Sequence, residues 1–133
     1  MPRSTSPRRA RRDRPTNRPM MSETHDRLAL ELRMAVEALV GAPSPDAYNV
    51  LTKMLAALNR SGIRLAALET ATATMNEICD RYERVGKIGL KDGEALALRC
   101  AAASIEATLP KLPVNVFARA VAEVEIYCAS IGA

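Results

Sequence analysis

Few side chains in this sequence could act as a nucleophile, a general base or a metal ligand. His25 is the only histidine, and it lies at the start of the first predicted helix, where a side chain is usually solvated. Cys79, Cys100 and Cys128 fall in three different predicted helices, and no CxxC pair occurs. A zinc site needs a larger set of Cys and His ligands, and a Cys–His couple needs the two residues in contact. We therefore expect no catalytic and no metal site, and interpret the cysteines as small buried side chains in a reducing compartment.

Motifs for phosphate or cofactor binding are missing as well. Gly86, Gly89 and Gly93 match neither GxxxxGK[ST] nor GxGxxG, and the Glu-x-x-His pair of a di-iron bundle does not occur. Many carboxylates lie four residues from an arginine, which favours solvated ion pairs along a helix. The expected pairs are Arg27–Glu31, Arg33–Glu37, Glu77–Arg81 and Asp80–Arg84. We expect a protein that is not an enzyme, with no cofactor and no small-molecule substrate.

The excess positive charge lies at one end of the chain. The formal net charge is +4 at pH 7, but residues 1–20 carry +6 and residues 21–133 carry −2. The first segment is rich in Arg, Pro and Ser and has almost no apolar residues, so we predict a disordered arm. Two interpretations are open: a basic arm that attracts phosphates or an acidic partner, and a plain solvated tail. The arginines of the arm are Arg3, Arg8, Arg9, Arg11, Arg12, Arg14 and Arg18.

The pair Met20 and Met21 offers a third interpretation of the arm. Met21 is followed by SETHDRLALEL, a natural helix start, so translation from Met21 would leave residues 1–20 unmade. In either case we expect one domain over residues 21–133, a length that fits a single domain.

The composition favours a cytoplasmic protein that does not enter the membrane. The hydrophobic fraction of 48% is enough for a core, which must be aliphatic because aromatics make up only 3%. No apolar run approaches the roughly 20 residues that span a bilayer. The basic N-terminus has no apolar stretch behind it, as a secretory signal would have.

Apolar residues recur at helical intervals along the rest of the chain, and Gly and Pro separate the segments. No segment alternates with period two over the length of a strand, so we predict no sheet. The pattern predicts an all-α fold, a compact bundle of about five helices. These run over about 24–40, from 45 to the turn at 59–62, over 63–85, from about 92 to 109 and over about 114–130.

The segment 63–85 carries an apolar seam whose spacing is 3, 4, 3, 4, 3. This spacing places the side chains on one side of a helix and resembles that of a coiled coil. We predict that this helix is central and that the others pack around it. The seam consists of Leu68, Ala71, Met75, Ile78, Tyr82 and Val85.

The last predicted helix has apolar residues beyond its main stripe, which is Phe117, Val121, Val124, Cys128 and Ile131. The additional positions include Val114, Val116 and Ile126, which we predict as an interface. So broad an apolar surface suggests two buried faces, one of which could meet a second subunit. The alternative is that this helix lies in the middle of its own bundle.

The second and third predicted helices, joined by the turn at 59–62, have the outline of a helix-turn-helix. The exposed start of the third helix has Arg64 as its one strong donor, and Glu69 would repel phosphate. The charge of −2 over residues 21–133 is also unfavourable for a duplex-binding surface. We therefore expect any contact with nucleic acid to be made by the arm.

The order of segments from Asp26 to Ala129 resembles that of short helical proteins encoded by bacteriophages and integrated elements of beta-proteobacteria. The segments are DRLALELRMAVEALVGAPS, NVLTKMLAALNRSGI, ETATATMNEICDRYERVGKIGL, EALALRCAAASIEATLPKL and FARAVAEV. Some of these proteins are labelled Fis-type regulators, but the basic C-terminal helix of Fis has no counterpart here, where Arg119 stands beside Glu123 and Glu125. The resemblance implies a mobile-element accessory protein that is not an enzyme.

Helix-mediated association is the function that these observations favour. We predict a non-enzymatic protein–protein interaction module of a phage or mobile element, whose partner is a host protein or a second copy in a homodimer. The alternative prediction is a small transcription regulator that binds DNA through the basic arm.

Overall fold

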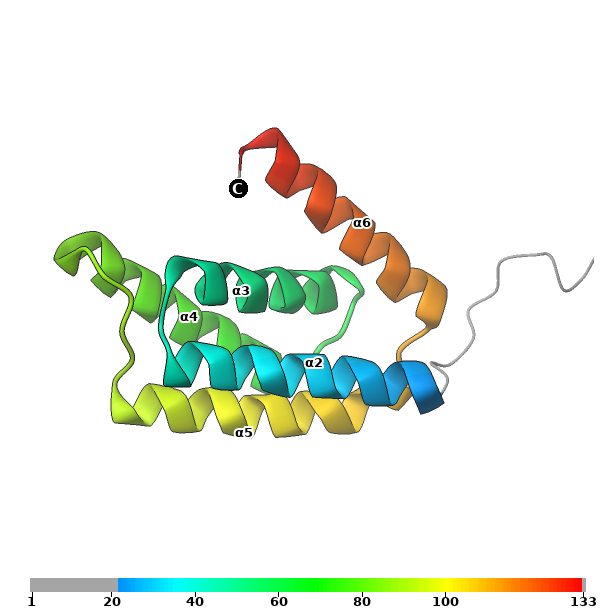
Figure 1. Cartoon of the computed structure of the whole chain (residues 1–133). Helices are drawn as coiled ribbons and strands as arrows, with labels where there is room; N and C mark the ends of the chain where they lie inside the picture. Colours follow the sequence, from blue (N-terminus) through cyan, green and yellow to red (C-terminus); the bar gives the residue numbers. More distant parts are fainter. Residues whose placement is uncertain (1–21, 133) are drawn as a thin grey trace, which may run out of the picture.

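The computed structural model describes residues 22–132 of the chain. The predicted arm at 1–20, and the choice between Met20 and Met21, lie outside these residues. Within them the chain forms helices and no strand, so the all-α bundle of five helices is confirmed (Figure 1). The elements are α2 (Ser22–Gly41), α3 (Pro45–Arg60), α4 (Ala66–Val85), α5 (Asp92–Thr108), the 3₁₀ turn η1 (Leu109–Lys111) and α6 (Val114–Ser130).

Local signals set the helix ends much as the sequence indicates. The Ser44 hydroxyl accepts a hydrogen bond from the Ala47 N–H at 3.1 Å, and Pro45 occupies the first position of α3. Gly86 ends α4 in the left-handed conformation, with φ 88°. The start of α4 differs from the prediction: residues 63–65 are not helical, and α4 begins at Ala66. Ile63 and Leu65 instead pack against the core.

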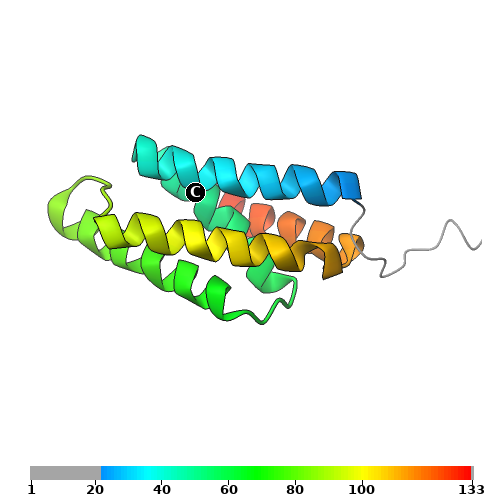
Figure 2. The ribbon, with the colours of Figure 1, turned by 90° about the horizontal axis from the view of Figure 1, so that it is seen from below.

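Helices α2, α3, α4 and α5 pack together, and α6 lies beside them on α3. Helices α2 and α5 lie side by side and antiparallel, α4 packs on α5, and α3 packs on α2 and α4 (Figures 1 and 2). Helix α6 lies on the remaining side of α3. The core is aliphatic, and its most buried large side chains are Leu32, Leu39, Leu51, Leu58, Ile78, Leu98, Ile105 and Leu109.

The prediction that the helix over 63–85 is central is wrong. Helix α4 contacts only α3 and α5 among the described helices, whereas α3 contacts α2, α4 and α6. The reason is that α3 has apolar side chains on two sides: Leu55 belongs to the main core, and the buried Ala57 lines a pocket together with Val124 of α6. The face of α4 opposite its seam is polar and exposed, with Glu77 and Asp80.

The predicted seam of α4 holds for its first four residues only. Leu68, Ala71, Met75 and Ile78 are buried, but Tyr82 is 36% exposed and Val85 is 59% exposed. The last turn of α4 projects past the neighbouring ends of α2 and α3 (Figures 1 and 2). The apolar spacing of α4 therefore continues through Tyr82 and Val85, although the neighbouring helices no longer cover this part of α4.

Candidate functional site

The residues considered for catalysis lie on different helices. Nδ1 of His25, near the start of α2, lies 3.2 Å from Oδ1 of the exposed Asp26. Cys79 on α4 and Cys128 on α6 are half-buried free thiols, and Cys100 on α5 is exposed, so the prediction of buried cysteines is wrong for Cys100. Cys100 follows Leu98 by two residues and points away from the core that Leu98 faces. Over residues 22–132, no three His, Cys, Asp or Glu side chains gather as metal ligands would.

A hydrogen bond from Tyr48 joins α3 to α4, and the pKa of Tyr48 is raised above its usual value. Its hydroxyl donates a hydrogen bond to the backbone carbonyl of Met75 at 3.2 Å. Burial raises the pKa of Tyr48, and the neighbouring Cys79 thiol raises it further. The phenol therefore stays protonated and keeps its role as a donor across the whole neutral range.

Helix α6 packs mainly on α3, and its Phe117 also packs against the main core. Of the described helices, only α3 approaches the backbone of α6, and the C-terminal end of α6 stands away from α3 (Figure 1). Ala120 and Val124 are buried on the side that faces the bundle. Three large apolar side chains remain in water: Ile126 is 69% exposed, Tyr127 63% and Ile131 58%.

The predicted interface residues of this helix differ in their exposure. Ile126 is exposed and Val116 is half-buried, while Val114 is the first residue of α6. The assignment of Ile131 to the buried stripe is wrong, because α6 diverges from α3 before Ile131 is reached. Sequence periodicity could not identify Tyr127 as a surface residue either, since the crossing of α3 and α6 decides which part of α6 is covered.

The divergence of α6 leaves a cleft of about 560 Å³, the α3–α6 cleft, between these two helices. The wall from α6 and its C-terminal end is mainly apolar, with Val124, Tyr127, Cys128 and Ile131, and the α3 wall is mainly polar, with Asn49, Thr52, Lys53 and Asn59. An ion pair joins the two walls: Nη2 of Arg60 lies 2.8 Å from Oε1 of Glu123.

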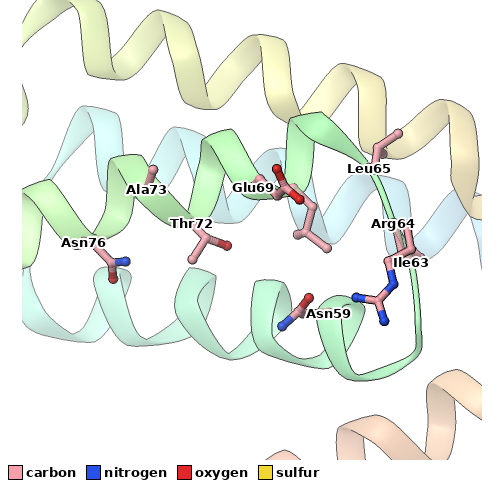
Figure 3. Close-up of a pocket in the computed structure, with 9 residues that line it drawn as sticks. Asn59, Ile63, Arg64, Leu65, Glu69, Thr72, Ala73 and Asn76 are labelled. Carbon is pink, nitrogen blue, oxygen red and sulfur yellow. The ribbon is translucent and has the colours of Figure 1, made fainter.

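A second groove, the polar groove, lies between the C-terminal end of α3 and the N-terminal half of α4 and measures about 390 Å³ (Figure 3). Ile63 and Leu65 are half-buried and supply apolar contact surface, while Leu68 is buried. The exposed polar residues that line the groove are Asn59, Arg64, Glu69, Thr72 and Asn76. Sequence reasoning singled out Arg64 and Glu69 but missed the other three, although the four-residue spacing of Thr72 and Asn76 was a signal that they share a face.

The polar groove contains the turn that has the outline of a helix-turn-helix. Arg64 is the one cationic side chain that lines it, and the carboxylate of Glu69 lines it too. The groove thus has no net formal charge, which is unlike a surface that binds duplex DNA. The seven arginines that we predict as a nucleic-acid contact all lie outside the described residues.

No protein-family model, curated protein or solved structure matches this chain. The resemblance to phage-encoded helical proteins therefore stays a prediction. None of the helices in residues 22–132 combines the length and the apolarity that crossing a membrane requires.

Proposed function

We propose that this chain is a non-enzymatic protein–protein interaction module that associates through α6, either with a second copy of itself or with another protein. The observation that carries the proposal is the exposure of Ile126, Tyr127 and Ile131 at the C-terminal end of α6, where Tyr127 and Ile131 also line the α3–α6 cleft. Large apolar side chains gathered at the surface are typical of interaction sites. Burying one such side chain stabilises a complex by about 1.5–3 kcal/mol before the costs of association are counted.

The charge distribution on α6 supports the same proposal. The helix has 17 residues and only three charged ones, Arg119, Glu123 and Glu125. Glu123 is already engaged by Arg60 within the chain. By contrast, α2 covers its polar side with ion pairs to α5, one of which joins Arg33 to Glu106 at 3.0 Å. Little charge on α6 opposes its burial against a partner.

Sedimentation velocity over a wide range of protein concentration tests self-association. We expect the sedimentation coefficient of the wild-type chain to rise with concentration, and Ile126→Glu to abolish the rise because it places a charge in the apolar contact. Leu96→Glu is the matched control, since Leu96 is 63% exposed on α5, away from α6, and should leave association unchanged. A chain that stays monomeric and retains no partner from a host lysate in an Ile126-dependent manner would contradict the proposal.

A second candidate function is favoured by the seven arginines among residues 1–20, which include one acidic residue only. A regulator that binds DNA through this arm would lose affinity steeply with salt, by about 0.9 in log K per contacted phosphate for each unit of log[salt]. Binding to duplex DNA that disappears when residues 1–20 are removed would support this function. Binding that survives the removal would contradict it.

The setting in a phage or mobile element belongs to the proposal and depends on the resemblance of the helical segments. The genes that flank this one provide the test. Integrase or virion genes on either side would support the setting, and a conserved block of metabolic genes would oppose it.

A further inference from the structure

The polar groove has hydrogen-bonding groups that the rest of the described chain does not use. Within residues 22–132, the side chains of Asn59, Thr72 and Asn76 have no hydrogen-bond partner in the protein. Neither Arg64 nor Glu69 forms an ion pair there, whereas Arg33, Arg60 and Arg99 on other surfaces all do. Five polar side chains around one groove are therefore free to contact a ligand.

The geometry of the groove matches a short extended chain. Figure 3 shows Thr72 and Asn76 on the side of α4 that faces α3, with Asn59 opposite them on α3. From Glu69 to Asn76 the axis of α4 advances by about 10 Å, which is the length of about three residues of extended peptide. A carboxamide offers both a donor and an acceptor, as a peptide unit does.

We propose that the polar groove binds an extended, uncharged segment of a partner protein through its backbone. Asn59 and Asn76 pair with peptide N–H and C=O groups, and Thr72 supplies a third polar contact between them. Ile63 and Leu65 contact one apolar side chain of the segment. The groove shares only Asn59 with the lining of the α3–α6 cleft, and the proposal for α6 does not depend on this residue.

The charge of the groove decides between a peptide and a nucleic acid. Arg64 and Glu69 cancel in formal charge, and an extended peptide backbone is neutral and polar. A nucleic acid strand would bring one negative charge per nucleotide close to Glu69 without enough cations to offset them. A neutral, polar peptide therefore fits the charge of the lining groups better than a nucleic acid does.

A random dodecapeptide display library, panned on the immobilised full-length chain, tests the inference. The groove variant is Thr72→Val with Asn76→Leu, which keeps the size of both side chains and removes their polar groups. The matched control is Thr70→Val with Ser104→Ala, two exposed polar residues that line neither the groove nor the α3–α6 cleft. All four positions are exposed and form no side-chain hydrogen bond, and circular dichroism verifies that both variants are folded.

We expect enriched peptides that bind the wild type and the control equally, and the groove variant at least about tenfold more weakly, as the loss of one or two hydrogen bonds implies. Methylating the backbone nitrogens of an enriched peptide should weaken binding by a similar factor. Three results would overturn the inference: no enrichment over the bare support, equal binding to the groove variant, or groove-dependent binding of a 20-nucleotide single strand in place of peptides. Peptides that are lost on Ile126→Glu but not on the groove substitutions would be assigned to α6, which separates the two proposals.

Discussion

Arg81 on α4 and Glu94 on α5 form a two-point ion pair across the loop that joins these helices. Nη1 of Arg81 donates to Oε1 of Glu94 at 3.0 Å, and Nη2 donates to Oε2. The same Nη1 donates to the carbonyl of Gly89 at 3.0 Å, and Oε1 of Glu94 accepts from the backbone N–H of Lys91 at 2.8 Å. The two side chains are only 19% and 10% exposed. One ion pair thus fixes both the loop and the first turn of α5.

Replacing Arg81 with Met should lower the free energy of unfolding by about 3 kcal/mol, because Glu94 is left with a buried and unpaired carboxylate. Urea denaturation followed by circular dichroism measures this loss. Arg99→Met is the control, since Arg99 also forms a two-point pair, with Glu37, but both side chains are about half exposed. If Arg81→Met and Arg99→Met lower the free energy of unfolding by the same amount, burial of the Arg81–Glu94 pair does not increase its contribution to stability.

The seam of α4 predicts a sharp contrast between two positions seven residues apart. Ile78 is fully buried, so Ile78→Ala should cost about 3 kcal/mol of stability through lost packing and a residual cavity. Val85 is 59% exposed, so Val85→Ala should change stability by less than about 0.5 kcal/mol. Thermal and urea unfolding measure both values. Equal costs would mean that the end of α4 is covered in solution.

Gly86 ends α4 with a positive φ of 88°, a conformation that an L side chain adopts with strain. Gly86→Ala should therefore lower stability by about 1 kcal/mol, although no atom lies within 4 Å of the added methyl group. Gly93→Ala is the matched control, because Gly93 lies in α5, has no positive φ and is equally open. The control should leave stability unchanged or raise it slightly, and a loss at Gly93 as large as that at Gly86 would refute the explanation by φ.

The raised pKa of Tyr48 gives a dependence of stability on alkaline pH. The unfolded phenol titrates near pH 10, while the folded one holds its proton to higher pH. The stability linked to Tyr48 is therefore complete below pH 10 and is lost as the pH rises through the folded pKa. Tyr48→Phe should cost about 1 kcal/mol at neutral pH through the lost bond to Met75. That difference should shrink above pH 10, and urea unfolding across the alkaline range would show it.

The charged residues show where sequence reasoning stops. Neighbours four apart on a helix predict the pairs Arg33–Glu37 and Glu77–Arg81, but each of these arginines pairs with a residue on another helix. Arg33 pairs with Glu106, and Arg81 pairs with Glu94. A partner on a neighbouring helix at a partly buried position interacts at lower dielectric than a neighbour on an exposed face. The spacing of charged residues along one helix does not show which residue of another helix an arginine will pair with.

The sequence alone determined the helices of this protein, because caps, glycines and the apolar period act within a few residues of each other. Ser44, Gly86 and the bounds of α6 follow from such local rules. Only the tertiary structure decided that α3 contacts three helices, that the seam of α4 ends at Ile78, and that Tyr127 and Ile131 stay in water. These features depend on the crossing angles and relative lengths of helices far apart in the chain, which the packing of side chains sets once all the helices are present.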